Sequence, residues 1–158
     1  MNIMVTGDRG YIGSVLVPMM RGRGYKVIGC DSGYFSENLL EDFDENYIKI
    51  TKDIRDISKE DLDGVNGIIH LAGLSNDPLG EFSPKLTQDI NYHGTMRLAD
   101  LARSAGVSRF VYASSQSMYG LSNTDIELDE DDSDKNTVTS YAIAKWSAEQ
   151  KLHEMSSK

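Results

Sequence analysis

The sequence of 158 residues has little of several features that mark particular protein classes. It contains one cysteine, Cys30, so it forms no internal disulfide and gives no sign of an oxidising compartment. No apolar run approaches the roughly 18 residues of a membrane helix, and the first residues lack the charged-then-apolar layout of a signal peptide. We therefore expect a cytoplasmic protein with no membrane partner.

Basic residues are scarce, because 16 Lys and Arg stand against 25 Asp and Glu and give a formal net charge of −9. Nucleic-acid affinity rests largely on clustered Lys and Arg, so this charge disfavours a nucleic-acid partner. The histidines His70, His93 and His153 lie far apart, and no Cys or His pair has ligand spacing, so we expect no metal. Seven carboxylates within residues 125–134 match no calcium loop, which favours a solvated loop over a metal site.

The chain is long enough for one sizeable core, and its 39% hydrophobic and 26% charged residues are typical of an ordinary globular domain. Alternating strands and helices imply a parallel sheet covered on both faces, and right-handed crossovers favour a doubly wound α/β sheet. Short apolar runs predict strands at residues 2–6, 26–30, 47–50, 67–71 and 109–113, and helical spacing predicts helices at 11–21, 84–105 and 139–153.

The first predicted helix breaks a local rule, because Pro18 lies about two turns inside it. A proline there removes a hydrogen bond and clashes with the preceding turn, so we expect a kink. Gly22 and Gly24 are predicted to supply the left-handed positions that end this helix before the second strand.

A glycine-rich turn joins the first predicted strand to the first helix, with Gly7, Gly10 and Gly13 at three-residue steps. Glycines permit a tight turn and let the backbone approach a pyrophosphate, whose charge is stabilised by the unpaired amides at the helix start. The spacing differs by one residue from the Gly-x-Gly-x-x-Gly pattern of other dinucleotide-binding folds. The turn is therefore a candidate dinucleotide-binding site.

Asp31 stands at the end of the second predicted strand, where an acidic residue would accept hydrogen bonds from the adenosine ribose hydroxyls. An aspartate at this place repels a 2′-phosphate and favours NAD over NADP. A turn residue at the strand end is the other interpretation of Asp31. Arg9, inside the glycine turn, could pair with a phosphate, and it keeps NADP open as the alternative cofactor.

Tyr141 and Lys145 stand four residues apart on the last predicted helix and so share one face, and Ser115 follows the fifth predicted strand. A neighbouring ammonium and a positive nicotinamide ring would favour the tyrosine phenolate, whose pKa is normally near 10. Tyr141 would then exchange a proton with a substrate oxygen that Ser115 holds by a hydrogen bond. Taken alone, Tyr141 and Lys145 are also an ordinary pair on a helix surface.

In this order, the motifs resemble those of the extended short-chain dehydrogenase/reductases that act on nucleotide sugars, and the resemblance covers nearly the whole chain. It implies a Rossmann fold, NAD as cofactor, and Ser115, Tyr141 and Lys145 as catalytic serine, base and electrostatic partner. It further implies that Asp53 and Ile54 line the adenine pocket, that residues 70–73 run along the cofactor, and that Asn91 is largely structural. The expected cofactor-binding residues are Gly7, Arg9, Gly10, Tyr11, Ile12, Gly13, Asp31, Asp53, Ile54, Leu71, Ala72, Gly73, Tyr141 and Lys145.

The residues after Ser115 help to choose among the reactions of this family. Relatives that eliminate water carry an Asp-Glu pair there, and relatives that decarboxylate a uronic acid carry a Glu at the second position, whereas this chain has Gln116 and Ser117. Without a carboxylic acid, those two chemistries lack their proton donor. The resemblance therefore implies an NAD-dependent epimerase that acts on a nucleotide sugar by reversible hydride transfer, with C4 favoured. The alternatives are a nucleotide-sugar dehydrogenase or reductase and a non-catalytic NAD(H)-binding module.

Members of this family are roughly twice as long as this chain. At about 150 residues per domain, such a length corresponds to two domains. We therefore expect residues 1–158 to be the cofactor-binding part, including the catalytic helix, with the substrate domain absent. By resemblance, we also expect a homodimer paired through the helices at residues 84–105 and 139–153. The segment 74–80 follows the fourth predicted strand, and it is either a sugar-contacting loop or a plain turn.

Overall fold

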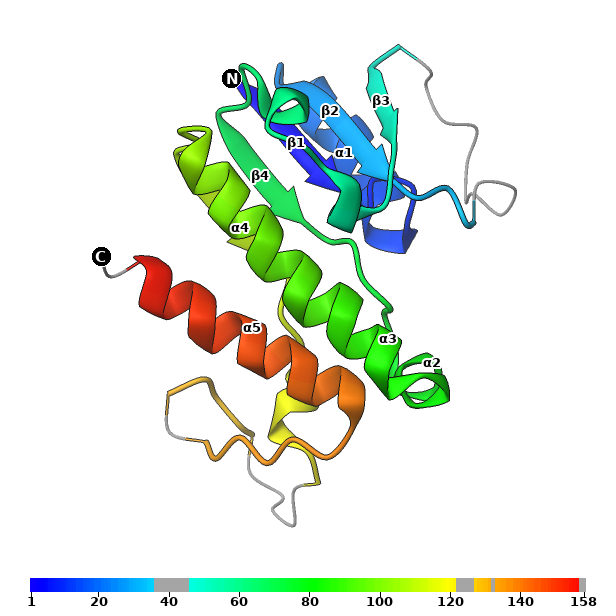
Figure 1. Cartoon of the computed structure of the whole chain (residues 1–158), viewed down its shortest axis with the longest axis vertical. Coiled ribbons are helices and arrows are strands. Elements are labelled where there is room, and N and C mark those ends of the chain that lie inside the picture. Colours follow the sequence, from blue (N-terminus) through cyan, green and yellow to red (C-terminus); the bar gives the residue numbers. More distant parts are fainter. Residues whose placement is uncertain (36–45, 122–126, 132, 157–158) are drawn as a thin grey trace. The chain divides into compact units, whose positions relative to one another are not determined.

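The computed structural model describes residues 1–35, 46–121, 127–131 and 133–156. Its strands form one parallel sheet in the order β3-β2-β1-β4-β5 (Figure 1). Each predicted strand is confirmed to within one residue at either end. The strands are β1 (Asn2–Thr6), β2 (Lys26–Asp31), β3 (Ile48–Thr51), β4 (Gly67–His70) and β5 (Arg109–Tyr112).

The chain divides into two compact units. The sheet unit consists of Met1–Gly73 and Gly94–Ala113 and holds all five strands. The helical unit consists of Leu74–His93 and Ser114–Lys158 and holds the segments between β4 and α4 and after β5.

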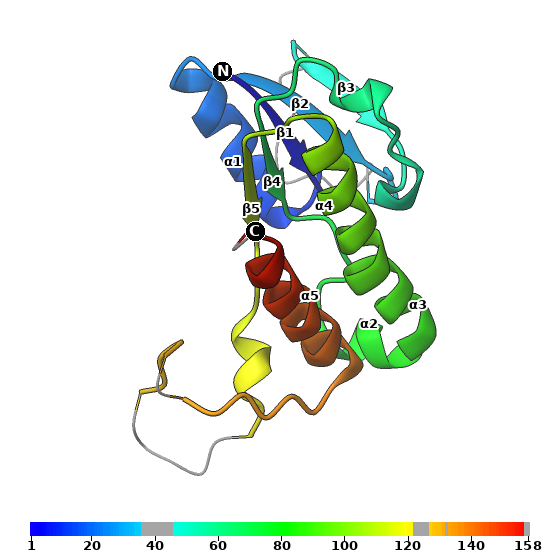
Figure 2. The same ribbon diagram turned by 60° about the vertical axis from the view of Figure 1, so that its left-hand side comes forward.

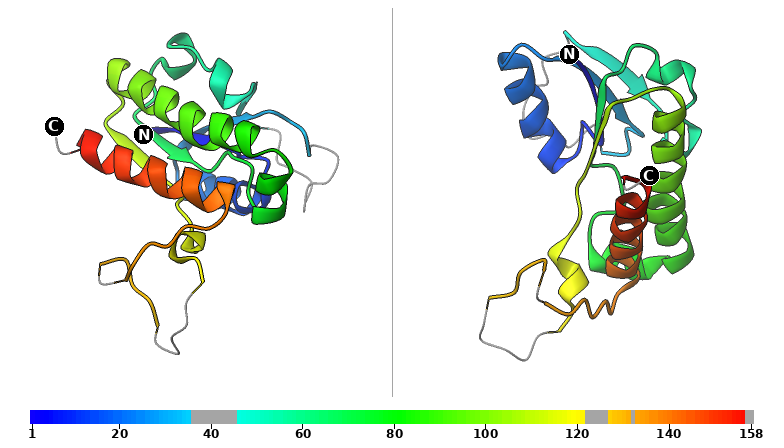
Figure 3. Two further views of the ribbon diagram at one scale, coloured as in Figure 1. Left: turned by 60° about the horizontal axis from the view of Figure 1, so that its bottom comes forward. Right: turned by 90° about the vertical axis from the view of Figure 1, so that its left-hand side faces the viewer.

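The sheet unit has helices on both faces of its sheet. The helix α1 (Tyr11–Gly22) lies on one face, and α4 (Thr95–Ser104) lies on the other (Figures 2 and 3). Strands that are covered on both faces bury nearly every residue, as Ile3, Met4 and Val5 of β1 show. From β1 the chain runs outward through β2 to β3 and then returns to β4 on the other side of β1, so the doubly wound fold is confirmed.

An apolar stripe on one side of α1 packs this helix against the sheet. Val17 and Met20 pack against Ile3, Val5 and Val27 of the sheet and form the core on this face. Pro18 lies inside α1, which is continuous from Tyr11 to Gly22, and the expected kink stays a prediction. One detail was wrong: Gly24 has a positive φ of 84°, but Gly22 does not, because it is the last helical residue.

The predicted helix at residues 84–105 is helical from Pro84 to Ser104, but its hydrogen-bonding pattern changes along this range. It consists of α3 (Pro84–Gln88), the π-helix η3 (Asp89–Gly94) and α4 (Thr95–Ser104). The predicted helix at 139–153 is α5 (Ser140–Ser156). None of the helices described combines the length and apolar character that crossing a membrane requires.

The segment 74–80, expected as a loop or turn, contributes instead to a short helix, α2 (Asp77–Phe82). The side chain of Asn76 accepts a hydrogen bond from the Leu79 amide at 2.9 Å and so caps this helix, and Pro78 lies in its first turn. Three 3-10 turns complete the described elements: η1 (Ile54–Asp56), η2 (Glu60–Leu62) and η4 (Gln116–Tyr119).

The two glycines of α1 provide a matched test of this packing. A Cβ added to Gly13 would overlap the carbonyl oxygen of Gly7 and lie 2.6 Å from the Asp8 Cα, whereas a Cβ on Gly22 would meet nothing within 4 Å. We expect Gly13→Ala to lower the free energy of unfolding by about 3 kcal/mol. Gly22→Ala should raise it by roughly 0.5–1 kcal/mol, because alanine favours a helix. Urea unfolding followed by circular dichroism checks both, and equal midpoints for the two variants would contradict the packing at Gly13.

Candidate functional site

The turn between β1 and α1 brings two stretches of backbone together without side chains between them. Gly7 has a φ of 73°, and a Cβ on it would lie 2.8 Å from the backbone nitrogen of Ala72. The Gly10 amide closes the turn by donating to the Gly7 carbonyl at 3.0 Å. No side chain of the described residues caps the start of α1, so the first amides of this helix are available to an anion.

The segment after β4 lies directly against this turn. The Leu71 amide donates to the Thr6 carbonyl at 3.0 Å, and the Ala72 amide lies 3.4 Å from the Thr6 hydroxyl. The structure therefore brings the glycine turn together with Leu71 and Ala72. His70, just before them, is a buried histidine whose ring nitrogens contact the hydroxyls of Thr6 at 2.6 Å and Thr95 at 2.9 Å.

Arg9 and Asp31 lie side by side at the carboxyl end of β2. The Nη2 of Arg9 donates at 3.0 Å both to the carbonyl oxygen of Asp31 and to the hydroxyl of Thr51. The Oδ1 of Asp31 accepts from the amide of Gly33 at 2.7 Å. Arg9 thus extends from the glycine turn to the ends of β2 and β3 and places its cationic group beside Asp31.

Asp53 and Ile54 follow β3 and begin the turn η1. Both carboxylate oxygens of Asp53 accept from the Arg55 guanidinium, at 3.0 Å to Nε and 2.8 Å to Nη2. These hydrogen bonds lower the pKa of Asp53, against an opposing effect of burial. The Ile54 side chain is 4% exposed and packs beside Gly94, so it can offer a ligand mainly its backbone groups.

Asp8, within the glycine turn, is a buried carboxylate that the sequence reasoning missed. It is 1% exposed, and its Oδ2 accepts a hydrogen bond from the hydroxyl of Tyr47 at 2.6 Å. Burial raises the pKa of Asp8, and the Tyr47 hydrogen bond opposes this effect. The sequence shows only an acidic residue between Gly7 and Gly10 of the turn, a place that an exposed turn aspartate could equally occupy.

The expected catalytic residues all lie in the helical unit. Ser115 precedes η4, and its Oγ accepts from the amide of Ser117 at 3.2 Å. The turn η4 packs against α5, which carries Tyr141 and Lys145 one turn apart. Lys145 is 6% exposed, and burial lowers its pKa to about 8, while the nearby Glu149 carboxylate acts in the opposite direction.

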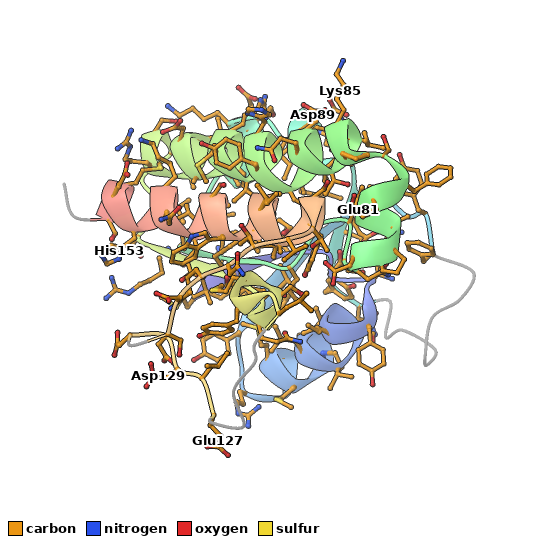
Figure 4. The ribbon with its side chains drawn as sticks, turned by 90° about the horizontal axis from the view of Figure 1, so that it is seen from below. Glu81, Lys85, Asp89, Glu127, Asp129 and His153 are labelled. Atoms are coloured by element: carbon orange, nitrogen blue, oxygen red, sulfur yellow. The ribbon has the colours of Figure 1, made fainter. Side chains whose placement is uncertain are left out.

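The helix α2 anchors the first turn of α5, just before Tyr141. The Thr139 hydroxyl donates to Asp77 at 2.5 Å and accepts from the Ala142 amide at 3.1 Å, which makes Thr139 the cap of α5. Glu81 accepts from the Ser140 amide at 2.5 Å, and its place on α2 beside the start of α5 is seen in Figure 4. This amide, with the Ser140 hydroxyl, lowers the pKa of Glu81. A further contact is tight, since a Cβ on Gly80 would lie 3.0 Å from the Tyr141 Cβ.

The side chain of Asn91 holds Leu74, the first residue of the helical unit, in place. Its Oδ1 accepts from the Leu74 amide at 2.8 Å, and its Nδ2 donates to the Leu74 carbonyl at 3.0 Å. The side chain is 2% exposed, and these two bonds use both of its functional atoms. The geometry agrees with the structural role that we expected for Asn91.

The acidic run was expected as a solvated loop. Its described carboxylates are exposed and lie in neither helix nor strand, and Glu127 and Asp129 project away from the helices in Figure 4. Asp125 and Asp132 lie outside the described residues. Within residues 1–35, 46–121, 127–131 and 133–156, no three His, Cys, Asp or Glu side chains are grouped so that they could hold a metal ion.

Comparison with known proteins defines the family. Residues 3–158 match the model of the NAD dependent epimerase/dehydratase family, and the chain belongs to this family. It is 31% identical to a UDP-glucose 4-epimerase of Rhizobium meliloti over 96% of the chain and 46% of that protein. The crystal structure of UDP-glucose 4-epimerase from Thermotoga maritima with UDP-glucose superposes with a TM-score of 0.89 at 26% identity, over 100% of this chain and 52% of that one.

The cofactor of the family is represented among the similar structures. A UDP-glucose 4-epimerase of Thermus thermophilus in complex with NAD superposes with a TM-score of 0.84 at 25% identity, over 98% of this chain and 50% of that one. The chain spans about half the length of the curated relatives that it matches first, at 49% and 46% of their lengths.

The capping of α5 leads to a prediction. Thr139→Ala removes the hydroxyl that joins Asp77 to the Ala142 amide, and we expect it to lower the free energy of unfolding by about 1 kcal/mol. Thr139→Ser keeps the hydroxyl and should retain most of this stability. Urea unfolding compares the two variants, and amide hydrogen exchange at Ala142 locates the effect. Equal stability of the alanine and serine variants would show that the cap is not formed.

Proposed function

We propose that the chain binds NAD at the turn between β1 and α1 and that it is the cofactor-binding part of a nucleotide-sugar epimerase. The observation that carries this proposal is the contact of Gly7 with the Ala72 backbone beside the uncapped start of α1. That arrangement lets the backbone approach a ligand closely and leaves the first amides of α1 as hydrogen-bond donors for an anion such as a pyrophosphate. Asp31 lies at the strand end where a ribose would follow.

The residues proposed to hold NAD divide by the part of the cofactor that each would contact. The amides of the glycine turn would bind the pyrophosphate, and the carboxylate of Asp31 would accept hydrogen bonds from the adenosine ribose. Asp53 and Ile54 would border the adenine, and the segment 71–73 would run along the cofactor. The full proposed set is Gly7, Arg9, Gly10, Tyr11, Ile12, Gly13, Asp31, Asp53, Ile54, Leu71, Ala72, Gly73, Tyr141 and Lys145.

The proposed chemistry is reversible oxidation of a ring carbinol, with C4 as the favoured carbon. NAD, when bound, supplies the group that accepts and returns a hydride. Tyr141 takes the hydroxyl proton at its Oη and later gives it back, and the ammonium of Lys145 stabilises the phenolate. Ser115 donates a hydrogen bond from its Oγ to the substrate oxygen. A pKa of about 8 leaves Lys145 mainly charged at neutral pH, as this role requires.

The substrate class is supported by what the similar proteins bind and by what this chain lacks. The Thermotoga structure contains UDP-glucose, which supports a nucleotide sugar as substrate. Gln116 and Ser117 follow Ser115, so no carboxylic acid is available there for elimination or decarboxylation. A dehydrogenase or reductase of the same sugars uses the same residues and is the second candidate. Pairing of two copies through residues 84–105 and 139–153, and a cytoplasmic location, stay predictions.

The cofactor assignment is tested by removing the proposed ribose ligand. Asp31→Ala should weaken NAD binding by roughly 10-fold or more, because it removes charge-assisted hydrogen bonds to the ribose. Isothermal titration calorimetry measures this, and Asp100→Ala, an exposed aspartate of α4, is the matched control. Unchanged NAD affinity in Asp31→Ala would refute the assignment.

NADP provides a second comparison in the same experiment. Arg9 lies beside Asp31, and its guanidinium is the group that a 2′-phosphate would contact. We expect the wild-type chain to bind NADP more weakly than NAD. We also expect Arg9→Ala to lower the affinity for NADP more than it lowers the affinity for NAD. Tighter binding of NADP than NAD by the wild type would reverse the preference.

The proposed base is tested by Tyr141→Phe in the longer epimerase of which we propose this chain to be the cofactor-binding part. This variant should lower conversion of UDP-glucose to its C4 epimer by about 10²–10⁴-fold, because the proton acceptor is lost. NAD affinity should stay within about twofold, since one contact among many is removed. Full activity in Tyr141→Phe would refute the role of the tyrosine. A wild-type chain that binds NAD but converts no sugar would fit both the cofactor-binding part of a longer epimerase and a non-catalytic NAD-binding module.

A further inference from the structure

Asp8 is a carboxylate buried inside the turn that we propose to hold a pyrophosphate. It stands between Gly7 and Gly10 and is 1% exposed. Burial of an ionisable group is costly unless partners compensate for the lost water. A buried acid at the binding site for an anion therefore requires an explanation beyond packing.

The sheet is shaped to admit this side chain. A Cβ on Gly29, in the middle of β2, would overlap the Oδ2 of Asp8 and lie 2.5 Å from its Cγ. The same Cβ would lie 2.7 Å from the Cε2 of Tyr47. A side chain at position 29 is therefore incompatible with the present arrangement of Asp8 and Tyr47. The absence of a side chain at Gly29 on β2 therefore leaves the space that the Asp8 carboxylate occupies.

Tyr47 is the hydrogen-bond donor to the buried acid. Its hydroxyl lies 2.6 Å from Oδ2, a length typical of an O–H donating to a charged oxygen. The Tyr47 ring is itself held by two cations, with the Arg21 guanidinium 5.6 Å and the Lys49 ammonium 5.2 Å from its centre. The hydroxyl is thereby fixed in place toward Asp8.

The other oxygen of the carboxylate, Oδ1, is buried and has no hydrogen-bond partner among residues 1–35, 46–121, 127–131 and 133–156. The charge on Asp8 is therefore only partly compensated. Besides burial, which raises its pKa, Asp8 faces the Asp31 carboxylate, which acts in the same direction, and Tyr47 and Arg9, which act in the opposite direction. The neighbouring Cys30 thiol has a pKa raised to about 12, so it exchanges no proton near neutral pH.

We propose that Asp8 is a positioning residue of the glycine turn and that its carboxylate takes up a proton when a dinucleotide pyrophosphate binds there. This inference rests on the proposed function, that the turn binds NAD. A pyrophosphate brings two negative charges to the same seven-residue turn, where they further disfavour the charged form of Asp8. A proton from solvent then adds to Oδ1, which has no partner in the described part of the chain, and Oδ2 still accepts from Tyr47.

The coupling between NAD binding and protonation of Asp8 can act in one direction only. Binding raises the pKa of Asp8, so the bound state holds more protons than the free state between the two pKa values. NAD affinity therefore increases as pH falls through that interval, by at most about tenfold per pH unit for one proton. Above the interval Asp8 is charged in both states, below it Asp8 is neutral in both, and the affinity is constant on either side.

The test is calorimetric titration of NAD at several pH values between about 5 and 8, in buffers of different ionisation enthalpy, which gives the number of protons taken up. The wild type should take up a fraction of a proton that peaks within the interval. Asp8→Asn keeps an oxygen for Tyr47 but cannot be protonated, so the uptake should disappear and the affinity should no longer follow pH. Asp100→Asn, a matched change at an exposed position, should behave as the wild type.

Tyr47→Phe provides an independent variant. It removes the donor to Oδ2, so Asp8 should be protonated more easily and the pH interval of proton uptake should move upward. ADP-ribose has the same pyrophosphate without the nicotinamide, and it should reproduce the proton uptake of NAD. Adenosine has no phosphate and should bind without it.

The outcomes separate this inference from the proposed function. If the wild type binds NAD and Asp8→Asn takes up the same fraction of a proton, the role of Asp8 is refuted while the cofactor site stands. If the wild type binds NAD at no pH, the proposed function fails, and the inference fails with it. If Asp8→Asn does not fold, as circular dichroism would show, Tyr47→Phe decides, and an unchanged pH interval overturns the proposal.

Discussion

The approach of Gly7 to the backbone of Leu71 and Ala72 is the constraint on which the sheet unit depends. A side chain at position 7 would displace the chain after β4, and the φ of 73° would add strain. The contact joins the carboxyl ends of β1 and β4, the two strands between which the chain reverses its direction across the sheet. The candidate binding site is thus a consequence of how two strand ends pack.

In the helical unit, the corresponding constraint is the anchoring of α5 by α2. The short helix α2 holds the start of α5 through Asp77 and Glu81 and contacts Tyr141 through Gly80. Lys145, on α5 one turn after Tyr141, is buried deeply enough to lower its pKa to about 8. The proposed catalytic groups Tyr141 and Lys145 thus stand on one helix whose first turn is capped and whose lysine is buried. The chemistry proposed for Tyr141 therefore depends on a short helix that the sequence did not make obvious.

Much of the fold could be predicted from the sequence because its main signals are local. Buried parallel strands are short apolar runs, and a strand followed by spaced glycines and a helix has few other uses. The π-helix at Asp89–Gly94 could not be predicted, since six residues of apolar spacing do not distinguish its hydrogen bonding from that of an α-helix. Asn76 and Pro78 are typical of turns, but they are equally typical of a helix start, which is what they form here.

The candidate site was harder to predict where it depends on burial. The glycines, Asp31, Tyr141 and Lys145 were chosen by residue type and spacing, and these properties are visible in a sequence. The pairing of Asp8 with Tyr47 joins residues 39 positions apart and exists only because Gly29 leaves space beneath them. No property of Asp8 alone distinguishes it from an exposed turn aspartate. Long-range burial of a charge is decided by the packed structure, and sequence spacing carries little information about it.

The charges around the glycine turn show how a chain with a net negative charge could still attract a phosphate ligand. Asp8 and Asp31 are both close to Arg9, so this part of the protein has no excess of positive charge. The attraction would come from the amides and the dipole of α1, which are neutral groups acting over one helix turn. Such a site attracts a compact pyrophosphate but offers nothing to an extended polyanion. A net charge of −9 therefore disfavours nucleic acid as a ligand and is compatible with a compact pyrophosphate.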